Sequence, residues 1–145
     1  MKISTKGRYA IKLMLDLATY HNGEPVSLKD IATRQGISEK YLEHIVSTLS
    51  KSGLVKSMRG SHGGYMLTGA PQNYTVRQIL NAVEGNISPV DCVGSTGVQC
   101  DRRGTCVSVR IWQKLYDAMN DVLEGITLSD LIDWQNEMIA DQYVI

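Results

Sequence analysis

Cysteine is missing from residues 1–91 and from residues 107–145 of this chain. All three cysteines, Cys92, Cys100 and Cys106, fall in the stretch DCVGSTGVQCDRRGTC. No apolar run approaches the ~20 residues that a membrane-spanning helix needs, and the N-terminus lacks a signal-peptide layout because basic residues recur inside its apolar pattern. We therefore expect a cytoplasmic protein without a membrane partner, where clustered thiols more often serve metals or redox sensing than disulfides.

Recognisable catalytic motifs are also lacking. The sequence shows no nucleophile–base motif, phosphate-binding loop or paired-carboxylate site. We therefore predict that the chain is not an enzyme. Its 145 residues favour one domain, or one domain with an appendage.

The net charge is zero, but the charges are unevenly distributed along the chain. Residues 1–68 carry ten Lys/Arg and five Asp/Glu, a net charge of +5, whereas residues 69–145 carry five Lys/Arg and ten Asp/Glu, a net charge of −5. A phosphate backbone would attract the first half and repel the second. The alternative is chance clustering of surface charge.

The N-terminal half contains three predicted helices. Apolar residues recur at helical spacing over residues 5–21, 27–36 and 38–53, and Ser27 and Ser38 are suited to cap the second and third helices. The turn ATRQGIS joins two short helices, as in a helix-turn-helix. An ordinary helical hairpin would give the same pattern.

A glycine-rich hairpin is expected after these helices. Residues 54–58 and 65–68 can form two strands, and the loop from Arg59 to Gly64 between them is too long for a two-residue turn. A basic hairpin directly after a helix-turn-helix is the layout of a winged helix, although a plain surface hairpin remains the alternative.

Three further helices are predicted over residues 75–84, 108–124 and 127–139. The long helix over 108–124 has an apolar stripe too wide for one small domain to bury, which favours packing on a second subunit over a plain core helix. We expect a mainly α fold: a winged helix-turn-helix over residues 1–85, a cysteine-rich loop over 86–107, and a dimerisation helix with a C-terminal helix over 108–145.

Three long strings carry a resemblance to a known family: ISTKGRYAIKLMLDLA, QGISEKYLEHIVSTLSKSGLVKSMRGSHGGYML and ITLSDLID. They resemble the Rrf family of winged-helix regulators, with the iron–sulfur (IscR) branch nearest and some features of the cysteine-metabolism (CymR) branch. The resemblance implies a homodimeric transcription factor. Such a dimer would place two recognition helices roughly 34 Å apart on a near-palindromic double-stranded DNA operator.

The residues expected to contact DNA belong to three groups. The recognition helix would present Ser38, Lys40, Tyr41, Glu43 and His44; the wing would present Arg59, Gly60, Ser61, His62 and Gly63; and Lys2, Thr5, Lys6 and Lys56 would contact phosphates. In IscR-like proteins a glutamate at the position of Glu43 resembles a selectivity filter, because a desolvated carboxylate without a donor is costly. The alternative is that Glu43 is solvated and only tunes charge.

The spacing Cys92-x7-Cys100-x5-Cys106 lacks the CxxC pairs of zinc ribbons and ferredoxins. It resembles the loop that holds a [2Fe–2S] cluster in the IscR branch. The resemblance implies a fourth ligand three residues after the last cysteine, where this chain has Val109, or an acidic residue near the partner's N-terminus, where this chain has Arg8. The fourth ligand is therefore unassigned, with Asp91 and Asp101 as oxygen donors to consider.

Other roles for the thiols stay open. They could form a thiol or nitric-oxide redox switch, bind another metal, or be purely structural. A different reading is a CymR-like repressor of cysteine and sulfur metabolism. The chain ends Tyr143-Val144-Ile145, and in that branch the resemblance implies control by cysteine synthase, which could capture the carboxylate of Ile145.

Overall fold

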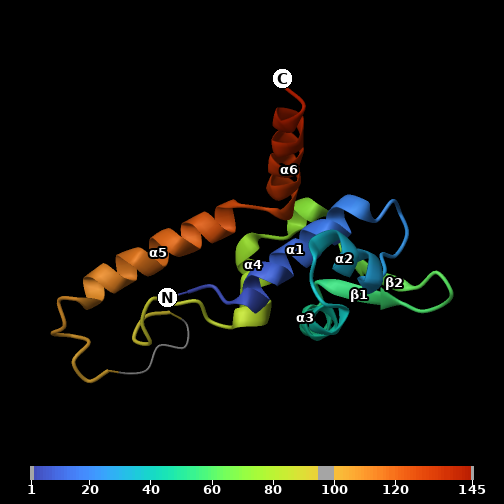
Figure 1. Cartoon of the computed structure of the whole chain (residues 1–145). Helices are drawn as coiled ribbons and strands as arrows, with labels where there is room; N and C mark the ends of the chain where they lie inside the picture. Colours follow the sequence, from blue (N-terminus) through green and yellow to red (C-terminus); the bar gives the residue numbers. More distant parts are fainter. Residues whose placement is uncertain (1, 95–99, 145) are drawn as a thin grey trace.

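The computed structural model describes residues 2–94 and 100–144, which form seven helical segments and one small sheet (Figure 1). In chain order they are α1 (Thr5–Tyr20), α2 (Leu28–Gln35), α3 (Glu39–Lys51), β1 (Val55–Met58), β2 (Gly64–Leu67), the 3₁₀ helix η1 (Pro71–Asn73), α4 (Val76–Glu84), α5 (Val109–Gly125) and α6 (Leu128–Gln142). The predicted helices and strands are all present, within three residues of the expected bounds.

Side-chain caps fix where most of these helices begin. Ser27, Ser38, Thr75 and Thr127 each accept a hydrogen bond from the backbone N–H three residues later. Such a cap satisfies one of the N–H groups that an α-helix leaves without a partner at its start. The caps expected at Ser27 and Ser38 are therefore confirmed, and Ser4 caps α1 in the same way.

Helices α1 to α4 and the hairpin β1–β2 pack together into a unit that we call the head, with α1 at its centre. The buried face of α1, with Leu13, Met14 and Leu17 fully enclosed, packs on α2, α3, α4 and β2. Leu42, Ile45 and Leu49 of α3 close the same core from the other side. The helix-turn-helix, α2 and α3, thus rests on one continuous apolar core.

The hairpin β1–β2 forms a wing beside the helix-turn-helix. Its antiparallel register pairs Val55 with Leu67 and Met58 with Gly64. Val26, in the connection from α1 to α2, adds a third partner through backbone hydrogen bonds with Tyr65 of 2.9 and 2.8 Å. Gly64 is required there, because a Cβ at this position would collide with the carbonyl oxygen of Val26.

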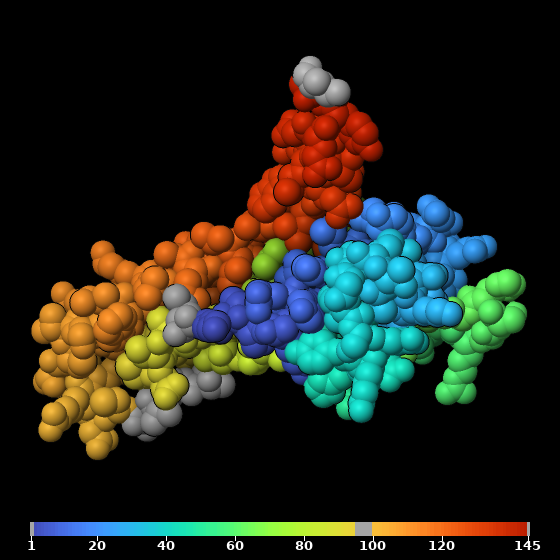
Figure 2. Space-filling model, in the orientation of Figure 1, coloured from blue at the N-terminus to red at the C-terminus, as the bar shows by residue number. Residues whose placement is uncertain are grey.

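Two helices, α5 and α6, extend from the head as arms, as both the cartoon and the space-filling view show (Figures 1 and 2). The C-terminal end of α5 is tied to α4 by an ion pair of 2.8 Å between Arg77 and Glu124, and its other end extends away from the head. The base of α6 is anchored by Leu128, which is fully buried in the head core. None of the described helices is long and apolar enough to cross a membrane.

Candidate nucleic-acid interface and cysteine segment

The recognition-helix candidates of α3 lie on the face opposite its buried residues. Ser38, Lys40, Glu43 and His44 are exposed, and Tyr41 is half-buried. A shallow hollow on this face is lined by Ser38, Lys40, Tyr41 and His44. The hydroxyl, ammonium, phenol and imidazole groups of these side chains are therefore available together for hydrogen bonds along a groove of a duplex.

Tyr41 is held by an aromatic contact that sequence analysis missed. Its ring meets Tyr9 of α1 edge to face, with centroids 5.7 Å apart and an interplanar angle of 88°. The ammonium of Lys12 lies 5.7 Å from the centre of the Tyr9 ring. Such pairs favour one ring orientation, so α1 helps to fix the side chain of Tyr41.

The wing places its candidates at an exposed tip. Arg59, Gly60, Ser61 and His62 are exposed and Gly63 is half-buried. The wing also forms a hollow that is lined by residues 57–61 and 63–65. Lys56 is exposed on β1, so the hairpin offers basic groups both at its tip and along one strand.

The N-terminal candidates sit where α1 begins. Lys2 and Thr5 are exposed and Lys6 is half-buried. The hydroxyl of Thr5 accepts a hydrogen bond of 2.9 Å from the guanidinium of Arg8, which brings a basic group to the same end of the helix. The start of α1 is therefore flanked by the basic side chains of Lys2, Lys6 and Arg8.

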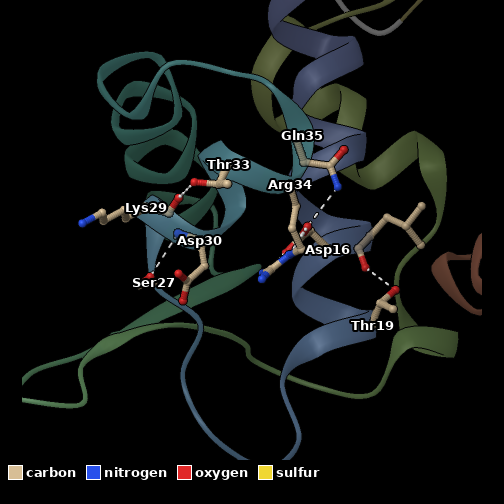
Figure 3. A network of polar contacts seen from close by, with 9 residues as sticks. Asp16, Thr19, Ser27, Lys29, Asp30, Thr33, Arg34 and Gln35 are labelled. Carbon is tan, nitrogen blue, oxygen red and sulfur yellow. Dashed lines mark hydrogen bonds and ion pairs between the residues drawn. The ribbon is translucent and has the colours of Figure 1, made fainter.

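The only fully buried charge among the described residues, Asp16, ties α1 to the helix-turn-helix (Figure 3). Its carboxylate accepts hydrogen bonds from Arg34 Nε at 3.1 Å, Arg34 Nη2 at 2.7 Å and Gln35 Nε2 at 2.9 Å. Arg34 also stacks over the ring of Tyr20 at 4.3 Å, and the hydrogen bonds from its guanidinium to Asp16 raise the pKa of Arg34. This clamp lies at the end of α2, directly before the turn into α3.

The described cysteines differ in how firmly they are held. Cys92 is half-buried next to Val93, which is fully buried. The hydroxyl of Ser88 donates to the carbonyl oxygens of Val90 and Val93 at 2.6 and 2.8 Å, which stabilises the turn that carries Cys92. Cys100 is exposed.

Cys106 lies just before α5. Its sulfur is 3.1 Å from the hydroxyl oxygen of Ser108. This hydrogen bond, assisted by the backbone N–H of Val109, lowers the pKa of the Cys106 thiol. A lower pKa favours the thiolate, the form that binds metals.

The cysteine segment, residues 86–107, fits an iron–sulfur cluster in the chemistry of its donors. Thiolates are the usual ligands of such clusters, and the three cysteines are exposed or half-buried. Among the described residues, however, no three His, Cys, Asp or Glu side chains are gathered as a metal site. Residues 95–99 lie outside the described part of the chain, and Asp91 and Asp101 are exposed on either side of them.

A helix-turn-helix followed by a β-wing defines a winged-helix DNA-binding protein. The family model described as "Rrf2: Iron-dependent Transcriptional regulator" matches residues 3–134. The chain belongs to this family of transcriptional regulators. The prediction that it is not an enzyme is thereby confirmed.

Two kinds of relative are about equally similar to the chain. CymR of Bacillus subtilis is 42% identical over 134 residues, which cover 92% of this chain and 91% of that protein. IscR of Erwinia tasmaniensis is 40% identical over 140 residues, which cover 97% of this chain and 84% of that protein. Sequence identity alone therefore does not separate a CymR-like from an IscR-like regulator.

Solved structures give the same balance. The structure of CymR, described as the global cysteine regulator of B. subtilis, matches with a TM-score of 0.75 at 42% identity, covering 92% of this chain and 98% of that one. IscR of T. potens matches with a TM-score of 0.76 at 39% identity, covering 95% of this chain and 90% of that one. The predicted mainly α winged-helix fold is confirmed by these matches.

Proposed function

We propose that the chain is a cytoplasmic, homodimeric regulator that senses iron–sulfur cluster status and controls genes of iron–sulfur cluster biogenesis. Cys92, Cys100 and Cys106 would hold a [2Fe–2S] cluster. The observation that carries this proposal is the confinement of every cysteine to one segment between α4 and α5. The IscR relatives and the iron-dependent description of the family support it.

The position of the cysteine segment suggests how it would act. It connects α4, which packs in the head, to the far end of α5. When bound, the cluster would supply a centre that is gained or lost with iron and sulfur supply. Cys92 lies beside the fully buried Val93, and Cys106 lies just before α5. Joining these thiols would fix the path between the head and α5.

We infer that α5 is the dimerisation helix. Ile111 and Val122 expose 58% and 59% of their surface, although both are large apolar residues. A groove along the same helix is lined almost wholly by apolar side chains: Ile3, Leu115, Ala118, Met119, Val122 and Leu123, with Lys2 at its edge. A second α5 would cover this surface and set the distance between two recognition helices on DNA.

The cysteine variants test the cluster proposal. The triple variant Cys92→Ser/Cys100→Ser/Cys106→Ser should be colourless after anaerobic purification, whereas the wild type should absorb visible light. A triple variant with Ser→Ala changes at the exposed Ser47, Ser57 and Ser61 is the matched control and should stay coloured. Equal absorption of the wild type and the cysteine variant would contradict cluster binding by these thiols.

A second candidate function is control of cysteine and sulfur metabolism. The match to B. subtilis CymR across 98% of its solved chain favours it. In this case we propose cysteine synthase as a partner that captures the C-terminal carboxylate of Ile145, a residue outside the described part of the chain. Deletion of Ile145 should then abolish binding to cysteine synthase in calorimetry, and undiminished binding would dispose of this partner.

A further inference from the structure

The beginning of α1 is held by a carboxylate from 80 residues away. Glu84 Oε1 accepts a hydrogen bond of 3.0 Å from the backbone N–H of Ser4, and it is also hydrogen-bonded by the Ser4 hydroxyl. The same hydroxyl oxygen accepts a hydrogen bond of 3.1 Å from the backbone N–H of Gly7. Ser4 is therefore the N-cap of α1 and the attachment point of α4 at once.

This arrangement completes a capping box through tertiary structure. In the local form of the motif, the third helical residue is Glu or Gln and accepts from the N-cap backbone N–H. The third residue of α1 is Gly7, which has no side chain. A Cβ at Gly7 would collide with Glu84 Oε1. Gly7 thus leaves room for the carboxylate of Glu84. This carboxylate takes the place of the Glu side chain that the local motif would have at position 7.

The electrostatics favour this contact over solvation of Glu84 on its own helix. Glu84 is the last residue of α4, where the helix dipole opposes a negative charge. The N-terminus of α1 attracts the same charge. The contact therefore anchors the N-terminus of α1 to α4, against which α1 packs.

Glu84 lies between two parts of the molecule with proposed roles. Lys2, Thr5 and Lys6, the candidates for phosphate contacts, flank Ser4 in the sequence. One residue after Glu84, Gly85 turns the chain with φ 77° and ψ −142°, a conformation that favours glycine. A cleft beside Glu84 is lined by Lys2, Ile3 and the first residues of the cysteine segment, 86–88.

We propose that Glu84 is a positioning residue for DNA binding. Through its hydrogen bonds to Ser4, it fixes the orientation of Lys2 and Thr5 at the start of α1, so that both side chains reach the phosphate backbone. This role rests on the proposed phosphate contacts of the N-terminal residues, and it does not depend on whether the cysteine segment holds a cluster.

Because Glu84 is negatively charged, long-range electrostatics and a positioning role predict opposite changes in DNA affinity when its side chain is removed. Removal of an acidic group near DNA should strengthen binding if only long-range electrostatics matter. If Glu84 positions Lys2, the variant Glu84→Ala should instead bind a non-specific duplex more weakly, on the order of tenfold at low salt. The slope of log K against log salt should shrink by about two units for a dimer, one lost contact per subunit.

The experiment measures fluorescence anisotropy of a labelled duplex with the full-length protein at several salt concentrations. Glu84→Gln keeps an acceptor oxygen and should retain most of the slope. Ser4→Ala should reproduce the loss, and the double variant Glu84→Ala/Ser4→Ala should be no worse, because both act through one contact. Glu24→Ala removes an exposed charge beyond the other end of α1 and should not weaken binding.

Thermal melting of each variant shows whether the protein is folded at the assay temperature. If Glu84→Ala is not folded, Ser4→Ala carries the test, because it should show the same loss of slope. The variant Lys2→Ala tests the phosphate contact itself, separately from its positioning by Glu84. If Lys2→Ala lowers the slope while Glu84→Ala leaves it unchanged or binds more tightly, the positioning role is wrong. An unchanged slope for Lys2→Ala would overturn the N-terminal phosphate contact and this inference together.

Discussion

At the residue scale, Asp16 shows how a buried charge can position a surface helix. It accepts from Arg34 and Gln35 and has no exposed side-chain surface. Its partner Arg34 retains 31% of its side-chain exposure, so part of the ion pair is screened by solvent. The clamp joins α1 to the end of α2, directly before the turn into α3, the proposed recognition helix.

Replacement of Asp16 should therefore destabilise the whole head. Asp16→Ala leaves Arg34 and Gln35 without their acceptor and should lower the free energy of unfolding by about 3 kcal/mol. Chemical denaturation measures the loss. Asp133→Ala, an exposed acid on α6, should change stability by no more than about 0.5 kcal/mol. Equal effects of the two substitutions would contradict the clamp.

Glu43 is the residue on which DNA selectivity should depend most. It is exposed on the recognition face of α3 and can accept from a cytosine amino group. Glu43→Ala should broaden the set of sequences selected from a random duplex library, because an unpaired carboxylate no longer penalises the wrong site. Glu39→Ala makes the same charge change in the first turn of α3 and should keep the wild-type selectivity; an unchanged set for Glu43→Ala would rule out the filter.

The buried face of a single helix could be predicted from the sequence far better than the contacts between helices. The spacing of Leu42, Ile45 and Leu49 identified the buried face of α3, because helical periodicity is local. No such signal links Asp16 to Arg34, or Ser4 to Glu84 across 80 positions. These polar contacts depend on how α1 packs against α2 and α4, which periodicity does not specify.

At the scale of elements, the caps explain why the helix starts were predicted well. Thr75 and Thr127 each form a complete capping box with the third residue of their helices. What the sequence did not reveal is that these two residues also pair with each other through a backbone bridge. This bridge joins the start of α4 to the start of α6, and it arises from chain packing rather than from local sequence.

The cap of α6 should make that helix sensitive to acid. The backbone N–H and the hydroxyl of Thr127 both donate to Asp130 and lower the pKa of this carboxyl group. A lowered pKa in the folded state means that the stabilisation is present above the ordinary aspartate pKa of about 3.9 and is lost as the pH falls through the folded-state value.

The variant Asp130→Asn cannot lose a charge with pH. Its melting temperature should therefore lie below that of the wild type at neutral pH, and the difference should shrink as the pH falls below about 4. Thermal melts followed by circular dichroism across this range measure the difference. A gap that stays constant with pH would show that the charge of Asp130 does not support the cap.

At the scale of the whole molecule, α5 and α6 extend from the head. This explains why the chain has more apolar residues than the head alone can bury. None of the residues of α5 is fully buried, although the helix carries the apolar groove described above. Exposed apolar surface of this kind fits the dimer interface proposed above. The wide stripe in the sequence predicted that this helix would carry more apolar surface than one domain buries, whereas the direction in which α5 leaves the head could be known only from the structure.

A charge placed in the groove should break the dimer. Val122→Glu puts a carboxylate among Leu115, Ala118 and Met119, where an unpaired charge is costly once buried. Light scattering should find a monomer. Arg110→Glu, an exposed position of α5 outside the groove, makes a larger charge change and should remain dimeric. A dimeric Val122→Glu variant would place the interface elsewhere.

The charge asymmetry also belongs to the whole molecule. The basic first half of the chain, net +5, builds α1, the helix-turn-helix and the wing, while the acidic second half, net −5, contains both arms. An approaching duplex is thereby drawn to the head and repelled by the arms. The proposed sensing segment lies at the far end of α5, away from the wing.

Iron and acid-labile sulfide analysis of the anaerobically purified protein tests the central claim most directly. A [2Fe–2S] cluster held by Cys92, Cys100 and Cys106 predicts about two iron and two sulfide per chain, together with visible absorption that the triple cysteine variant lacks. A colourless protein without iron or sulfide that still responds to its signal would contradict the cluster account and favour control through cysteine metabolism.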